Sequence, residues 1–219
     1  MRTTSMLQSR TMTALSEPFL NTKWRLRTSA KILTEPGFAS LKHQLNLHVV
    51  GVAGFARPWS RLSLGGAHLV QVVSDARATI CHVLADRQRR HGRRLVMASG
   101  ATKQGVLQLA YEVCAFLSIA AMGIAPDQAL NFPLGRMRYM LPFGSLFGDE
   151  SPVFIQAIDE LIVLGGGPQS QREIFSAAQA RRPITVIQGF GGIADQLSPA
   201  LLPGACFIGR VDTCGAAFS

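Results

Sequence analysis

Short apolar runs that end in a turn recur along this chain, and stretches with helical spacing separate them. Each run is apolar at nearly every position instead of at alternate ones, which is typical of strands that are buried on both faces. Strands that alternate with helices form parallel sheets with helices packed on both sides. The sequence therefore predicts an α/β fold whose strands are residues 47–54, 94–99, 117–124, 160–164, 183–187 and 205–208.

The helices predicted between these strands are residues 68–90, 104–116, 151–159 and 170–180. In the first of them, apolar side chains recur at helical spacing from Leu69 to Leu84. Its last turn is rich in arginine, and cations there interact favourably with the helix dipole. The arrangement is that of a Rossmann-like parallel sheet of about five to six strands with helices on both faces.

Glycines stand at the carboxyl ends of the predicted strands. Of the first five strand ends, four carry glycine, at Gly54, at Gly100, at Gly165–Gly167 and at Gly189–Gly192. Ligands of open parallel sheets bind at this edge. Because a residue without Cβ lets the backbone approach an anion closely, the coincidence predicts a pocket for a phosphate group.

Charge divides the chain into two parts. The formal net charge is +9, and residues 1–44 alone hold seven lysines and arginines against two acidic residues. We therefore separate a basic N-terminal extension, residues 1–44, from a ligand-binding domain, residues 45–219. The extension fits an organellar presequence, a segment upstream of a later start at Met12, or an arm packed on the domain. The domain is only mildly basic, which suits a small anionic ligand and does not call for nucleic acid.

The spacing of the four cysteines and the hydropathy of the chain bear on the cellular compartment of the protein. No two of Cys81, Cys114, Cys206 and Cys214 form a C-x-x-C pair, so we expect neither a zinc site nor a disulfide framework. We expect a soluble protein of a reducing compartment, cytoplasmic unless the basic N-terminus directs import into a mitochondrion or plastid. The longest apolar stretch, residues 106–125, contains three polar residues and does not read as a membrane span. No cofactor is predicted.

A first candidate phosphate loop joins the second predicted strand to its helix. Glycines at Gly100 and Gly105 would let a phosphate approach the backbone, while the hydroxyls of Ser99 and Thr102 and the amine of Lys103 would add donors. The loop lacks the G-K-[ST] end of a Walker A motif. The structural alternative is a tight turn with capping residues.

A second candidate loop follows the fourth predicted strand. Gly165, Gly166 and Gly167 precede Ser170 and Glu173, which open the next helix. The glycines form an anion cradle in this interpretation. Ser170 and Glu173 also have the spacing of a capping box, so Glu173 has a structural alternative to a role in the site.

Arginines and histidines give weaker patterns. Arg136 and Arg138 lie in an irregular segment, from which they could reach a phosphate or simply face solvent. The arginines at the end of the first long helix lack the interleaved aromatic residues that stack on bases, so we do not expect a nucleic-acid partner. The five histidines are scattered, and none pairs with an obvious serine or cysteine nucleophile.

Taken in order, these pieces resemble the SLOG superfamily, which includes the LONELY GUY-type phosphoribohydrolases and nucleotide-sensing relatives. The resemblance covers roughly Leu47 to Phe207. Residues 159–167 are similar to the strand that leads into the family motif P-G-G-x-G-T-x-x-E. In that register Gly166 and Gly167 take the paired glycines, and Glu173 matches the glutamate. Three positions depart from the motif, because Gly165 replaces its proline, Gln169 its later glycine and Ser170 its threonine.

The resemblance implies three functions that differ in class. The first is a nucleotide-binding domain that recognises a nucleoside phosphate or an ADP-ribose-like molecule. The second is a phosphoribohydrolase that cleaves nucleoside 5′-monophosphates, with Glu173 at the ribosyl centre and Arg136 or Arg138 as the arginine that works with it. The third is a structural subunit that keeps the fold without the activity. The family also implies a homo-oligomer, usually a dimer.

Overall fold

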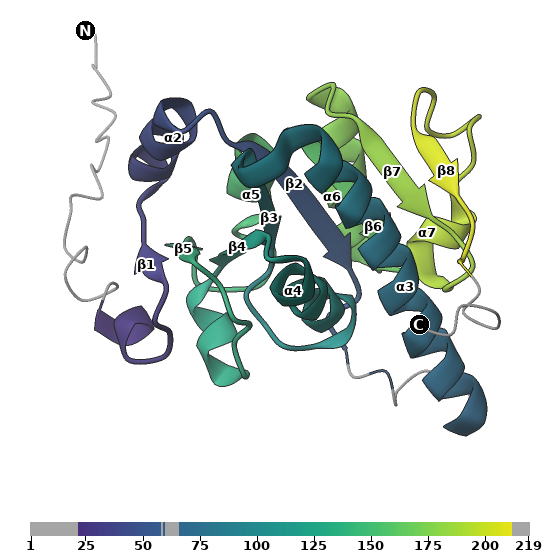
Figure 1. Ribbon diagram of the computed structural model, residues 1–219, viewed down its shortest axis with the longest axis horizontal. Helices are drawn as coiled ribbons and strands as arrows, with labels where there is room; N and C mark the ends of the chain where they lie inside the picture. The colour runs from purple at the N-terminus through teal and green to yellow at the C-terminus, as the bar shows by residue number, and fades with distance from the viewer. Residues whose placement is uncertain (1–21, 58, 60–65, 212–219) are drawn as a thin grey trace, which may run out of the picture.

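A parallel sheet forms the centre of the computed structural model, which describes residues 22–57, 59 and 66–211. The sheet has eight strands in the order β1-β5-β4-β3-β2-β6-β7-β8 (Figure 1). Every neighbouring pair is parallel. The strands are β1 (Lys31–Ile32), β2 (His48–Gly54), β3 (Leu95–Ser99), β4 (Ala120–Ala125), β5 (Tyr139–Pro142), β6 (Glu160–Leu164), β7 (Ile184–Ile187) and β8 (Cys206–Ile208).

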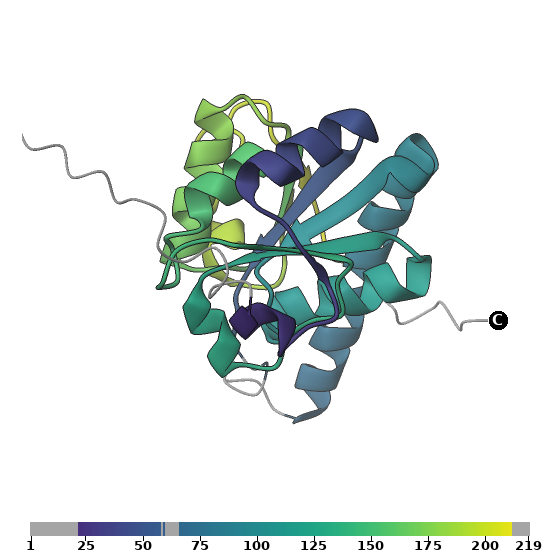
Figure 2. The same ribbon diagram turned by 90° about the vertical axis from the view of Figure 1, so that its left-hand side faces the viewer.

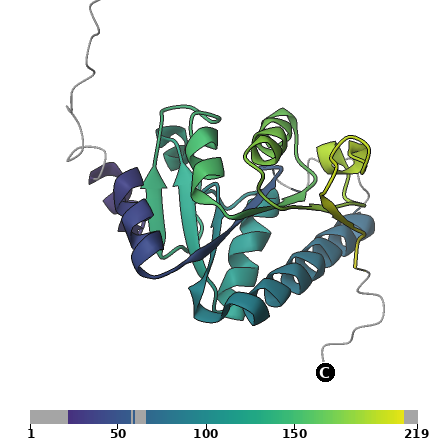
Figure 3. The ribbon, with the colours of Figure 1, turned by 90° about the horizontal axis from the view of Figure 1, so that it is seen from above.

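Helices cover both faces of this sheet, as Figure 3 shows from above. α3 and α4 pack on one face, and α2, α5, α6 and α7 contribute to the core on the other. The helices are α2 (Glu35–Gln44), α3 (Gly66–His91), α4 (Gly105–Leu117), α5 (Ser151–Ala157), α6 (Pro168–Gln179) and α7 (Gly192–Gln196), with two short 3-10 helices, η2 (Gly92–Arg94) and η3 (Asp127–Asn131). The predicted α/β class with a Rossmann-like parallel sheet is confirmed.

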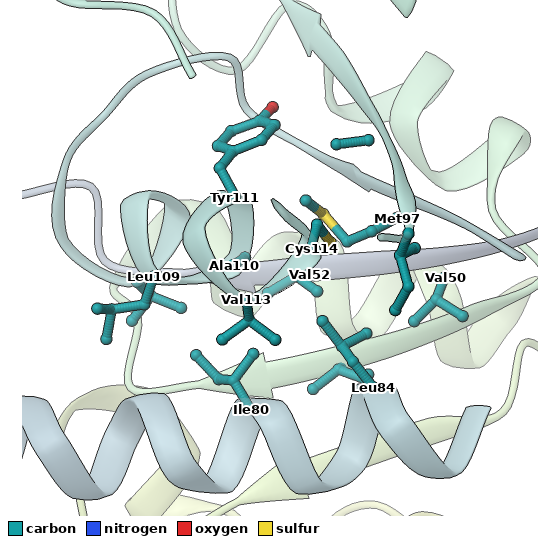
Figure 4. Close-up of a cluster of buried hydrophobic side chains, with 14 of the residues drawn as sticks. Val50, Val52, Ile80, Leu84, Met97, Leu109, Ala110, Tyr111, Val113 and Cys114 are labelled. Carbon is teal, nitrogen blue, oxygen red and sulfur yellow. The ribbon is translucent and has the colours of Figure 1, made fainter. Parts of the chain in front are cut away.

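The central strands are apolar throughout because both of their faces are covered. Every residue of β3 and of β6 is buried. The α3–α4 side is the larger layer of packing, and Figure 4 shows Ile80 and Leu84 of α3 directed at Val113 of α4 and at the sheet. Burial of a side chain of this size contributes about 1.5–3 kcal/mol, so this layer fixes the position of both helices.

The six strands predicted from the sequence correspond to β2, β3, β4, β6, β7 and β8. The two additional strands, β1 and β5, lie together at one edge of the sheet. β1 has only two residues, and β5 has four residues inside a segment that is rich in proline and glycine. Neither is long enough to show a period in the sequence, which explains why the predicted sheet was smaller.

The described part of the N-terminal extension, residues 22–44, packs against the domain. Trp24 is completely buried in the main core cluster, and its indole Nε1 donates to Asp127 Oδ1 at 3.2 Å. β1 pairs with β5, and Phe38 of α2 is buried in the cluster on the opposite face. Figure 2 shows this segment lying across the edge of the sheet. Residues 1–21, to which a presequence would belong, lie outside the described part of the chain.

No helix in the described part of the chain is both long enough and apolar enough to span a membrane.

We expect Trp24→Ala to lower the free energy of unfolding by about 3–5 kcal/mol, because it removes a large buried side chain and leaves a cavity. Urea denaturation measures this change. Leu26→Ala is the matched control, since Leu26 is 81% exposed two residues away, and it should change stability by less than about 0.5 kcal/mol. Equal stability of the two variants would show that the extension contributes nothing to the fold.

Candidate functional site

The chain order of the strands reverses between β2 and β6. From β2 the chain builds outward through β3, β4 and β5, and it then returns to place β6 on the other side of β2. The carboxyl ends of β2 and β6 therefore lie at the point where the strand order reverses, which is where open parallel sheets bind their ligands. A cavity of about 670 Å³ lies at this point, and it is lined by Gly54, the last residue of β2, and by Gly166, which follows β6.

The turn after β6 forms one wall of the cavity. Gly166 has a φ of +91°, which side chains rarely adopt. A Cβ on Gly192, the first residue of α7, would lie only 2.5 Å from the carbonyl oxygen of Gly166. Gly167 is the N-cap of α6, and a Cβ placed on it would meet no atom within 4 Å. The backbone at Gly167 therefore borders open space beside the first N–H groups of a helix, which lack intrahelical partners.

The structure brings together most of the residues that the sequence singled out. Those that line the cavity are Gly54, Gly100, Thr102, Gly166, Gly167, Ser170 and Glu173. They come from the ends of three neighbouring strands, β2, β3 and β6, and from the first turns of α6. The two candidate glycine loops therefore belong to one site.

Other predicted residues have structural positions instead. Ser99 is buried and its Oγ donates to the carbonyl of Val52 at 2.7 Å. Gly105 lies against the Phe55 carbonyl, which its missing Cβ allows, and Gly165 lies beneath the Phe55 ring. Lys103 is exposed and does not line the cavity.

Arg136 and Arg138 do not line the cavity either. Both are exposed, while Gly135, Met137 and Tyr139 between and beside them are buried. The guanidinium of Arg138 lies 5.4 Å from the centre of the Tyr139 ring. Among the residues that the structure describes, the arginine that lines the cavity is Arg57, which is exposed and follows β2.

Glu173 belongs to a buried pair of carboxylates. Glu173 is 7% exposed and Glu150 is 5% exposed, and both line the cavity. The side-chain amide of Gln169 joins them, because its Nε2 donates to Glu150 Oε1 at 3.0 Å and to Glu173 Oε1 at 3.1 Å. Ser151 Oγ also donates to Glu173 Oε1 at 2.8 Å, and the Gly148 N–H donates to Glu150 Oε2 at 2.8 Å.

Burial dominates the electrostatics of this pair. It raises the pKa of the Glu173 carboxyl above its ordinary value of 4.5, against the hydrogen bonds from Ser151 and Gln169, which act in the opposite direction. Burial likewise raises the pKa of Glu150, and the neighbouring charge of Asp149 adds to that rise. Within this pocket the protonated form of each acid is therefore more favourable than it is in water.

The capping-box alternative for Glu173 does not match the helix. α6 begins at Pro168, two residues earlier than predicted, since proline suits the first position of a helix. Ser170 therefore lies inside the first turn, and its Oγ donates to the Gly54 carbonyl at 3.4 Å. The Glu173 carboxylate contacts the side chains of Ser151 and Gln169, as described above, and faces the cavity.

Several residues of the site were not found from the sequence. Glu150 lies just before α5, and no local pattern connects it with Glu173, which is 23 residues away. Five phenylalanines also line the cavity, namely Phe55, Phe132, Phe147, Phe154 and Phe190. Phe132 and Phe147 form a tilted pair with ring centres 5.9 Å apart. The signal that could have indicated them was the abundance of phenylalanine, 12 residues against two tyrosines and two tryptophans.

Comparisons with known proteins show which solved structures have a similar fold. No protein-family model matches the sequence, and no curated protein matches it. Among solved structures, the molybdenum cofactor binding protein of the phototrophic bacterium Rippkaea orientalis is similar with a TM-score of 0.54 at 14% identity, over 74% of this chain and 88% of that one. The structural-genomics protein TM1055 has a TM-score of 0.53 at 18% identity, over 74% and 92%.

A third similar structure is the molybdenum cofactor carrier protein of Chlamydomonas reinhardtii, with a TM-score of 0.50 at 16% identity over 76% of this chain and 91% of that one. At these identities the likeness concerns the fold. The chain shares a Rossmann-like fold with these proteins. This agrees with the fold that the resemblance to the SLOG superfamily implies.

We expect Glu173→Gln to stabilise the protein at pH 7. Folding raises the pKa of the Glu173 carboxyl, so the protein loses stability as the pH rises above the pKa that this group has in the unfolded chain. Glutamine carries no charge and removes that loss, while its side-chain oxygen still accepts a hydrogen bond from Ser151. The difference in melting temperature should shrink toward pH 4.5 and vanish below it. Glu112→Gln is the control, since it breaks an exposed ion pair with Arg77 and should give no gain at pH 7. The expectation would be contradicted if the stability of Glu173→Gln relative to that of wild type were lower at pH 7 than at pH 4.

Proposed function

We propose that this chain binds a phosphorylated, nucleotide-like small molecule in the cavity between β2 and β6. The observation that carries the proposal is the open backbone at Gly167, at the start of a 12-residue helix and within a cavity of about 670 Å³. A cavity of this volume lies within the range of pockets that hold nucleotide-sized ligands, about 300–1,000 Å³.

The phosphate of such a ligand would lie against the turn Gly166–Gly167. Free N–H groups and the positive end of the α6 dipole favour an anion there. Arg57 is exposed at the same cavity and can approach the phosphate from the solvent side. The carboxylates of Glu150 and Glu173 would repel a phosphate, so they favour the neutral part of the ligand, where they can accept from sugar hydroxyls or from ring N–H groups.

The planar part of the ligand would pack against phenylalanine. Phe132 and Phe147 line the cavity together, and Phe147 is 41% exposed. Stacking of a heterocyclic base on an aromatic ring is worth about 1–3 kcal/mol and tolerates different bases. The cavity therefore offers a backbone cradle for the phosphate, carboxylates for hydroxyl or N–H donors, and apolar rings for the base.

A phosphoribohydrolase is the second candidate, and the burial of Glu173 in the cavity favours it. A carboxylate beside the sugar could stabilise the positive charge that develops at the ribosyl carbon. The hydrolases of the family use an arginine with that glutamate, but Arg136 and Arg138 are exposed outside the cavity. We therefore favour binding without turnover. Release of free base from nucleoside 5′-monophosphates by wild type, and its loss in Glu173→Gln, would establish the hydrolase instead.

We expect Gly167→Val to abolish nucleotide binding without unfolding the protein. Its φ is −135° and its Cβ would enter empty space, so the fold tolerates a side chain that stands where the phosphate lies. The matched control is Gly209→Val, whose Cβ is equally free and which does not line the cavity. Thermal shift and calorimetry with AMP, GMP and ADP-ribose measure binding.

Wild type and Gly209→Val should gain stability from one of these ligands, and Gly167→Val should not. The same assay includes the molybdenum cofactor, because two proteins of similar fold are named for it. A chain that binds none of these molecules in the folded state would favour the structural-subunit alternative. A homodimer remains a prediction, which light scattering on the purified chain tests.

A further inference from the structure

Two histidines and a glutamate meet at the end of the sheet opposite the cavity. His48 is the first residue of β2, Glu160 is the first residue of β6, and His91 is the last residue of α3. One potential ligand atom from each lies within 4.8 Å of the other two. The amino ends of parallel strands share one edge, so this cluster is separated from the candidate pocket by the length of the strands.

The three side chains are already in contact with one another. His48 Nε2 lies 3.1 Å from Glu160 Oε1, a hydrogen-bond distance. The imidazole rings of His48 and His91 stack with their centres 3.6 Å apart and 3° between their planes. Glu160 is buried, and both histidines are half-buried. The cluster therefore places the ring nitrogens of two imidazoles beside a buried carboxylate oxygen.

A second carboxylate lies near this cluster. Asp159 Oδ2 is 4.0 Å from His48 Nδ1, which is too far for a hydrogen bond, and it accepts from the Val49 N–H at 2.8 Å. Lys42 Nζ holds Asp159 in place at 2.7 Å. Asp159 therefore adds negative charge on the side of the ring opposite the nitrogen that faces Glu160.

Arg87 already binds the Glu160 carboxylate and would compete with a metal ion for it. Its Nε donates to Glu160 Oε2 at 2.9 Å and to Oε1 at 3.1 Å. A carboxylate has about four lone-pair directions, so this contact leaves acceptor capacity on Oε1, the oxygen that faces His48. Arg87 also donates to Asp86 and to Thr185, which hold its guanidinium in place beside Glu160.

We propose that His48, His91 and Glu160 form a binding site for a late first-row divalent metal ion, Zn²⁺ being the expected occupant. Two imidazoles with one carboxylate are a common ligand set of zinc, whereas Mg²⁺ and Ca²⁺ prefer oxygen ligands alone. His91 turns about its Cβ–Cγ bond to break the stack, because parallel rings cannot direct both nitrogens at one point. The ion links β2, β6 and α3, and a water completes its coordination.

The test is a titration of the purified full chain with Zn²⁺ by calorimetry, and with Co²⁺ by visible absorption, after treatment with EDTA. Wild type should bind one equivalent, and His48→Gln and His91→Gln should each lose about 100-fold or more in affinity. His82→Gln is the matched control, since His82 is exposed on the same helix, α3. Circular dichroism and the melting temperature in EDTA establish that each variant is folded.

Zinc should also raise the melting temperature of wild type and of His82→Gln, and it should leave that of His91→Gln unchanged. Nucleotide binding at the opposite edge should be the same in all four proteins, which separates this site from the proposed pocket. Failure of folded wild type to bind zinc would overturn the proposal. Zinc binding of equal affinity in wild type and His91→Gln would also overturn it, because the ion would then lie elsewhere, at a cysteine for example.

Discussion

The close approach of neighbouring turns at the carboxyl edge of the sheet is the constraint on which the rest of the structure depends. A Cβ on Gly54 would lie 2.5 Å from the carbonyl oxygen of Leu164, and one on Gly192 would lie 2.5 Å from that of Gly166. Real side chains do not tolerate such distances to backbone atoms. Glycine at these two positions therefore lets the end of β2 lie against the end of β6, and the start of α7 lie against the turn after β6.

Because of this constraint, a glycine at a strand end can have a structural role instead of a role in ligand binding. Most glycines at the strand ends border the cavity. At Gly54 and Gly192 the missing Cβ also lets backbone segments approach one another. Gly167 and Gly191 are different, because no atom lies within 4 Å of the position that a Cβ would take on either of them, and both line the cavity. A glycine-rich sequence therefore predicts the edge at which a ligand binds, but it does not say which glycine the ligand touches.

Much of the fold could be predicted from the sequence because its strands are buried on both faces and their apolar runs are continuous. The edge strands β1 and β5 could not, since they are too short to show a pattern. The side chains of Arg136 and Arg138 illustrate a second limit. They alternate with the buried residues Met137 and Tyr139, so the chain runs as an extended segment into β5 with both arginines on its solvent side. The sequence alone left open whether they reach a phosphate or face solvent.

The buried carboxylates of the cavity could not be predicted as a pair. Glu150, Gln169 and Glu173 come from two different elements, and Gln169 occupies a position where the family motif has glycine. The longer side chain brings an amide between the two acids, in a space that a glycine would leave open. The departure from the motif therefore has a structural role, because it places an amide between the two carboxylates that line the cavity.

The buried Trp24 has a consequence for the order in which the protein is made. Its hydrogen-bond partner, Asp127, is 103 residues further along the chain, and β1 can pair only after β5 exists. A ribosome delivers the segment that holds Trp24 before its docking surface, so the indole has no partner until these 103 further residues have been made. Contacts of such long sequence separation form slowly, and apolar surface that is exposed in the meantime favours aggregation.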